Sequence, residues 1–185
     1  METYTCHSGG CPGADMFWER SAKIVGIKTI AYSFPKHAQE GEYPKILNSE
    51  ELNEGWDNVV IASKSLNRNL KNITTYVRCL LSRNWFQVKN SDSIFAIGKF
   101  INEKTVDGTG WAVQMSIDNK KPTFIFEQNK NHWYRFNYEI DKFEECDIPA
   151  LTLNFAGIGT REINDAGKKA IIGVFLKYAN DNDLT

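Results

Sequence analysis

The stretch HSGGCPGAD (residues 7–15) stands between a short strand-like run and a helical pattern, and it indicates the fold more strongly than any other part of the chain. Glycine lets backbone N–H groups approach a ligand closely, and a helix start offers unpaired donors at the positive end of its dipole. Such a turn is a common anion site, most often for phosphate. The stretch has neither a Walker loop nor GxGxxG spacing, which disfavours a standard ATPase or NAD dehydrogenase.

Two more glycine turns, DGTG (107–110) and AGIGTR (156–161), complete a pattern of alternating strands and helices. Strand-like runs lie at residues 4–7, 28–34, 93–97, 122–126 and 151–156, and helical spacing covers 14–25, about 70–88, 110–118 and 163–179. This alternation predicts an α/β fold, a Rossmann-like open, mainly parallel sheet with helices on both faces, in one domain spanning 1–185. Because the carboxyl ends of parallel strands share one edge, we expect the three turns to meet at one ligand crevice.

Two segments show no clear periodicity. Residues 35 to about 55 are polar and irregular, which predicts a long loop, and the 35–65 region can serve as a ligand lid or as a subunit contact. Residues 127–148 mix aromatic and charged side chains, which predicts a loop with room for an edge strand.

Composition narrows the class of protein. The 185 residues are 42% hydrophobic and 24% charged, as expected for one globular domain. The net charge of −1 and pI near 6.3 argue against broad nucleic-acid binding. No apolar run approaches the roughly 18 residues of a membrane span, and no signal peptide is evident. We therefore expect a cytoplasmic protein whose scattered cysteines are reduced thiols, namely Cys6, Cys11, Cys79 and Cys146.

Residues of the first turn are the clearest binding candidates. Its glycines allow close approach to phosphate, although a tight turn without a ligand has the same sequence. Asp15 either accepts a hydrogen bond from a ribose hydroxyl or caps the helix. His7 can touch a ligand, but a lone histidine is more often structural. The ligand-binding candidates here are Ser8, Gly9, Gly10, Gly13, Ala14 and Asp15.

The other turns add hydroxyl, aromatic and charged groups. Thr109 can bind phosphate or cap a helix, and Trp111 can stack on a base or belong to the core. Arg161 can clamp phosphate, or pair as a surface arginine, and Glu162 can pair with it, bind a sugar or cap the helix. Arg83 reaches the crevice or lies on a solvated helix face. The candidates here are Arg83, Gly108, Thr109, Gly110, Trp111, Gly159, Thr160, Arg161 and Glu162.

HSGGCPGAD, SDSIFAIG, DGTGWAVQM and FAGIGTRE together resemble the SLOG superfamily. This Rossmann-like group contains DprA-type proteins, LOG-type phosphoribohydrolases, and the YpsA/YspA-like and molybdenum-cofactor-carrier-like families. The resemblance covers most of the chain outside roughly residues 35–65 and 127–148. It implies a nucleotide-binding crevice and a dimer or higher homo-oligomer, and it is compatible with a phage-encoded protein in a defence conflict.

The LOG-type enzymes of this group differ from the chain in the residues that follow the second glycine turn, where those enzymes carry catalytic residues. In LOG-type enzymes a glutamate pair follows the second turn, whereas here the turn is followed by Trp111-Ala112-Val113-Gln114. Cleavage of an N-glycosidic bond needs such a carboxylate. We therefore expect no catalytic residue, metal or cofactor. The leading hypothesis is binding, for sensing or sequestration, of a nucleotide-derived signal such as an ADP-ribose-like or cyclic nucleotide.

Three alternatives remain open from the sequence. A LOG-type nucleotide N-glycosidase can use Asp15, Asp107 or Glu162 instead of the missing pair. An interaction protein can keep the fold with its crevice filled by Trp111 or by the 35–65 region. DNA binding of the DprA kind is disfavoured by the net acidity, so the expected partner is a nucleotide-like small molecule and not a membrane or nucleic acid.

Overall fold

A computed structural model describes residues 3–42, 44–101, 104–105 and 107–183. Its main sheet has eight strands in the order β3-β2-β1-β10-β4-β7-β8-β9. The first six in that order run parallel, and β8 and β9 add an antiparallel edge. The predicted open, mainly parallel α/β sheet is thus confirmed. The strands are β1 (Thr5–Ser8), β2 (Lys28–Ser33), β3 (Pro44–Ile46), β4 (Ser93–Gly98), β7 (Thr123–Glu127), β8 (His132–Asn137), β9 (Lys142–Cys146) and β10 (Asn154–Gly159).

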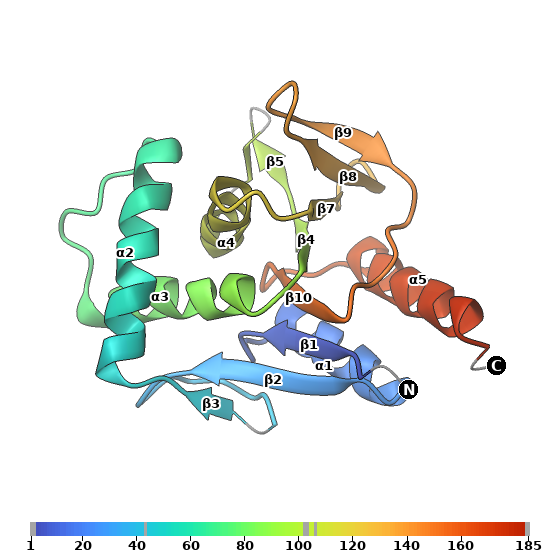
Figure 1. Cartoon of the computed structure of the whole chain (residues 1–185), viewed down its shortest axis with the longest axis horizontal. Helices are drawn as coiled ribbons and strands as arrows, with labels where there is room; N and C mark the ends of the chain where they lie inside the picture. Colours follow the sequence, from blue (N-terminus) through green and yellow to red (C-terminus); the bar gives the residue numbers. More distant parts are fainter. Residues whose placement is uncertain (1–2, 43, 102–103, 106, 184–185) are drawn as a thin grey trace.

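Helices cover both faces of this sheet (Figure 1). On one face α1 (Ala14–Ile24) and α5 (Asp165–Asp181) bury an aromatic core that includes Trp18, Phe95 and Phe155. On the other face α2 (Ser49–Ser65), α3 (Thr75–Lys89) and α4 (Asp107–Asp118) pack over a second core. Strand β4 serves both cores because its side chains alternate, Phe95 and Ile97 on one side and Ile94 and Ala96 on the other.

The strand order reverses direction next to β1. From β1 the chain moves to β2 and β3 on one side, and it then crosses through α2 and α3 to β4 and β7 on the other side. Strand β10 fills the place between β1 and β4. Ligands of open α/β sheets bind beyond the carboxyl ends of the strands at such a reversal. In this protein that edge carries the ends of β1, β10 and β4.

The region predicted to be a long loop contains a strand and a long helix instead. Strand β3 pairs with β2, and α2 begins at Ser49. Asn48 accepts a hydrogen bond from the Glu51 amide (2.9 Å), and the Glu51 carboxylate accepts one from the Asn48 amide (2.8 Å), which makes a capping box. The sequence Asn-Ser-Glu-Glu carries this signal, but the weak apolar periodicity after it hid the helix.

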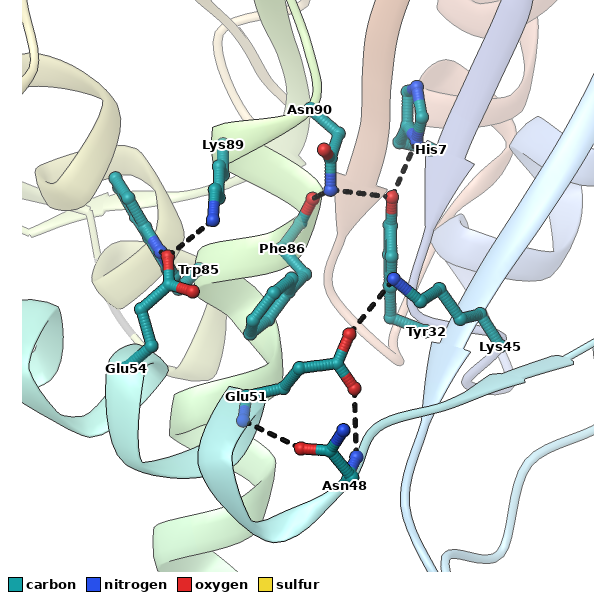
Figure 2. A network of polar contacts seen from close by, with 10 residues as sticks. All are labelled: His7, Tyr32, Lys45, Asn48, Glu51, Glu54, Trp85, Phe86, Lys89 and Asn90. Atoms are coloured by element: carbon teal, nitrogen blue, oxygen red, sulfur yellow. Dashed lines mark hydrogen bonds and ion pairs between the residues drawn. The ribbon is translucent and has the colours of Figure 1, made fainter.

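Helix α2 is fixed to its neighbours by polar contacts that Figure 2 shows. The Trp85 indole (2.8 Å) and the Lys89 ammonium (2.6 Å) on α3 both contact the Glu54 carboxylate. Lys45 on β3 pairs with Glu51 at 3.0 Å. At the crossing of α2 and α3, a Cβ atom added to Gly55 would lie 2.2 Å from the Ser82 carbonyl oxygen. The 35–65 region is therefore an integral layer of the domain.

Other boundaries also differ from the sequence prediction, including α4, which begins at Asp107 rather than at residue 110. The helix expected over about 70–88 begins only at Thr75, where the Thr74 hydroxyl accepts from the Val77 amide. The expected strand 151–156 is displaced to Asn154–Gly159. Within residues 127–148 the expected edge strand is present as β9, but β8 pairs with it, so a hairpin replaces most of the expected loop. A short hairpin of β5 (Phe100–Ile101) and β6 (Lys104–Thr105) precedes α4. Within the described ranges, none of the helices combines the length and apolar character needed to cross a bilayer.

Candidate functional site

A cleft of about 630 Å³ opens at the carboxyl edge of the sheet, where the strand order reverses. Its walls come from α3, from the first turns of α1 and α4, and from the segment that follows β10. Its apolar lining residues are Ile73, Val77, Leu80, Leu81, Trp111, Ala112 and Ile158. Its charged lining residues are Asp15, Arg83, Arg161 and Glu162, so the cleft offers both apolar and charged groups.

Arg83 on α3 is the buried cation of this cleft, with 5% of its surface exposed. Its Nη1 lies 3.8 Å from the Asp15 carboxylate, and its Nη2 donates to the Cys11 sulfur at 3.1 Å. Its Nε has no acceptor among the described residues. The guanidinium lies against the backbone of Gly9, where an added Cβ atom would overlap it. A side chain at position 9 would therefore displace the guanidinium from this place.

Asp15 lies between the first and third turns. Its carboxylate accepts a hydrogen bond from the Gly159 amide of the third turn at 3.1 Å. Burial raises the pKa of the Asp15 carboxyl, while Arg83 and the amides of Gly159, Cys11 and Gly9 act in the opposite direction. Arg83 and these amides are all hydrogen-bond donors, and donors favour the ionised form of a carboxylate. The Gly159 amide is therefore already paired with the protein's own carboxylate, which the amides of Cys11 and Gly9 also favour in its ionised form.

The third turn is also satisfied internally and packs tightly on the first. The Thr160 amide donates to the Ile97 carbonyl (2.9 Å), the Thr160 carbonyl accepts from the Ala14 amide (3.0 Å), and the Glu162 amide donates to the Thr160 hydroxyl (3.1 Å). Gly13 has a φ of 103°, and a Cβ atom there would lie 2.6 Å from the Arg161 backbone. What this turn presents to the cleft is therefore chiefly side chains, with Arg161 and Glu162 at its mouth.

The second turn contributes the start of α4 to the cleft. Gly108 and Thr109 line it, and the Gly108 carbonyl accepts from the Asn84 side chain of α3 at 3.5 Å. Trp111 is 7% exposed and belongs to the core while one side lines the cleft. The Arg68 guanidinium lies 5.5 Å from its ring centroid. The tryptophan forms part of the wall and leaves the cleft hollow.

The structure brings together most, but not all, of the sequence-predicted site residues. Those that line the cleft are Asp15, Arg83, Gly108, Thr109, Trp111, Gly159, Thr160, Arg161 and Glu162. Those outside its lining are Ser8, Gly9, Gly10, Gly13, Ala14 and Gly110. Ser8 is fully buried, and its hydroxyl accepts from the Gly10 amide at 3.3 Å. The Asp107 side chain lies outside the described part of the structure.

Sequence reasoning missed a second group of lining residues. Cys11 lies between Arg83 and His37, whose Nε2 is 3.7 Å from the sulfur, and burial raises the pKa of this thiol despite Arg83. Gln87 is 2% exposed, and its Nε2 has no partner among the described residues. The signal for Gln87 was its spacing, since it lies one helical turn after Arg83 on α3.

His7 is a structural residue of the sheet interior. Its Nδ1 lies 3.0 Å from the Tyr32 hydroxyl, which also accepts from the Asn90 side chain at 2.8 Å (Figure 2). Burial lowers the pKa of His7 to about 4. Because His7 is not part of the cleft lining, its role is to hold β1, β2 and the end of α3 together.

The fold and the cleft together define a Rossmann-like α/β protein with an open site at its strand-order reversal. A search of solved structures finds the crystal structure of a putative molybdenum carrier protein from Syntrophus aciditrophicus SB, determined at 1.45 Å. It is similar with a TM-score of 0.51 and 13% sequence identity, over 95% of this chain and 96% of that one. The match shows a shared fold. Neither the protein-family models nor the curated proteins give a match.

Proposed function

We propose that this protein binds a nucleotide-derived small molecule in the cleft and does not turn it over. The observation that carries the proposal is that one cleft combines apolar side chains, among them Leu80 and Trp111, with the guanidinium groups of Arg83 and Arg161. A base or other flat apolar group suits the apolar side chains, and a phosphate suits the guanidinium of Arg161. The volume of about 630 Å³ matches the size of sites for small ligands.

The surroundings of the two carboxylates in the cleft, those of Asp15 and Glu162, favour binding without turnover. Asp15 is 5% exposed and already holds amides and Arg83, so it is poorly placed to activate water. Glu162 is exposed at the mouth of the cleft, where solvent screens its charge. The solved protein that shares this fold is described as a putative molybdenum carrier protein, and a carrier role for this chain would agree with binding without turnover.

The biological role in this proposal is sensing or sequestration of a signal nucleotide, in the conflict between phage and bacterium. Assembly into a dimer or higher homo-oligomer is part of the same proposal. Analytical ultracentrifugation with and without ligand tests the assembly. A monomer in both conditions would remove that part and leave ligand binding untouched.

Isothermal titration calorimetry against a panel of phosphorylated nucleosides tests the function. We expect saturable binding of at least one of them, and a loss of about tenfold in affinity for Arg161→Ala, which removes a charge-assisted contact. Arg20→Ala is the matched control, because Arg20 is an exposed arginine on α1 outside the cleft. No binding across the panel would refute the proposal.

Chromatography of the same mixtures separates binding from catalysis. An intact nucleotide after long incubation at high protein concentration is the expected result. Release of free base would instead assign the protein to the N-glycosidases, with Glu162→Gln as the first variant to examine.

A further inference from the structure

We propose that the Asp15 carboxylate is a built-in anion that fills the place of a ligand phosphate and makes the cleft select ligands of low negative charge. The favoured class is then a nucleotide with one phosphate group, either a monophosphate or a cyclic mononucleotide, over ADP-ribose-like or triphosphate ligands. This ligand class rests on the proposed function, whereas the filled cradle, by which we mean the donors of Gly159 and Arg83 around Asp15, rests on the geometry alone.

The cradle has the construction of an anion site. The Gly159 amide donates to the Asp15 carboxylate at 3.1 Å, and the backbone amides of Gly9 and Cys11 also lower its pKa. The Arg83 guanidinium adds a positive charge at 3.8 Å. Amides that favour an anion in this way, next to a cation and a helix start, bind phosphate in other proteins. Here the helix itself supplies the anion, since Asp15 lies in the first turn of α1.

The charges of the cleft balance one another. Its charged lining residues are two cations, Arg83 and Arg161, and two carboxylates, Asp15 and Glu162. Within these four, Asp15 neutralises the buried arginine, which leaves the exposed Arg161 as the cation that a ligand meets first. A triphosphate brings several negative charges into a site with no net positive charge among these residues, and the negative charge of Asp15 repels it.

One buried donor of the cradle remains unused. Arg83 is only 5% exposed, and its Nε has no acceptor among the described residues. Such a group is costly to leave unsatisfied, and an acceptor atom of a bound molecule relieves that cost. If Asp15 is removed, the Gly159 amide and the Nη1 and Nε groups of Arg83 become available to an external anion.

Inorganic phosphate is the probe for the cradle, because it needs no apolar contact. Differential scanning fluorimetry compares wild type, Asp15→Ala and Glu162→Gln in phosphate and in chloride at equal ionic strength. Glu162→Gln makes the same change in net charge without opening the cradle. We expect a saturable, phosphate-specific rise in Tm for Asp15→Ala alone, because a ligand that binds the folded state stabilises it.

A second variant covers the case in which Asp15→Ala does not fold. Asp15→Asn keeps the size of the side chain and leaves Arg83 without its counter-charge, so its Tm should also rise with phosphate more than that of Glu162→Gln. Asp15→Ala that refolds only in phosphate counts as support. Equal Tm in phosphate and chloride for every folded Asp15 variant would overturn the inference.

Calorimetry with the mono- and triphosphate of one nucleoside tests the ligand class. For wild type we expect the monophosphate to bind at least about tenfold more tightly, and Asp15→Asn should reduce that ratio. A triphosphate that binds wild type as well as the monophosphate would refute the selection. If neither nucleotide binds while phosphate stabilises the Asp15 variants, the proposed function fails and the filled cradle stands.

Discussion

Replacing Arg83 with leucine tests whether the floor of the cleft is a true buried ion pair. Arg83 and Asp15 are each 5% exposed, and their charged atoms are 3.8 Å apart. Removing one partner of such a pair costs about 3–5 kcal/mol, because the other charge stays buried without compensation. Since Asp15 retains its amide donors, we expect the lower end, about 3 kcal/mol of lost unfolding free energy.

Urea denaturation at pH 7.5, followed by tryptophan fluorescence, measures this loss. Arg161→Leu is the matched control, because it removes the same group from an exposed position of the same cleft and should cost less than about 1 kcal/mol. Without the arginine, the Asp15 pKa rises further, so the penalty of Arg83→Leu should shrink as the pH falls. A loss below about 1 kcal/mol at pH 7.5 would show that solvent reaches the pair and would refute the reasoning.

Three further predictions concern the scaffold of the site. The pKa of His7 is lowered from 6.5 to about 4, so the folded state binds its proton less tightly than the unfolded chain. The free energy of unfolding should therefore be highest above pH 6.5 and fall by roughly 3 kcal/mol toward pH 4. Urea midpoints across that range measure this, and a dependence as steep in His7→Phe would contradict it. Gly55→Ala should cost about 2 kcal/mol in the same assay, because its methyl group would overlap the Ser82 carbonyl oxygen; Gly108→Ala, with no described atom within 4 Å of its Cβ position, is the comparison. Asn48→Ala should cost about 1 kcal/mol through loss of the capping box, and an unchanged midpoint would show that α2 does not need it.

Local patterns in the sequence were sufficient for most of the fold. Apolar runs such as SIFAI became buried parallel strands, and alternation with helical spacing gave the layered α/β architecture. These signals are local, because a strand buried on both faces must be apolar throughout. The pattern missed α2, and between residues 127 and 148 it gave the edge strand β9 but not its partner β8, because tertiary contacts override weak periodicity there.

That residues from the three glycine turns line one cleft was also predictable, because strand ends that share an edge bring the turns after them together whatever their separation in sequence. Its chemistry was decided only by the tertiary structure. The sequence shows glycines and an aspartate, but not that Asp15 accepts from the Gly159 amide of the third turn, nor that Arg83 arrives from a helix far along the chain to neutralise it. Hydrogen bonds and ion pairs depend on distances of a few ångströms between segments that only folding brings into contact, and such distances leave no trace in residue spacing.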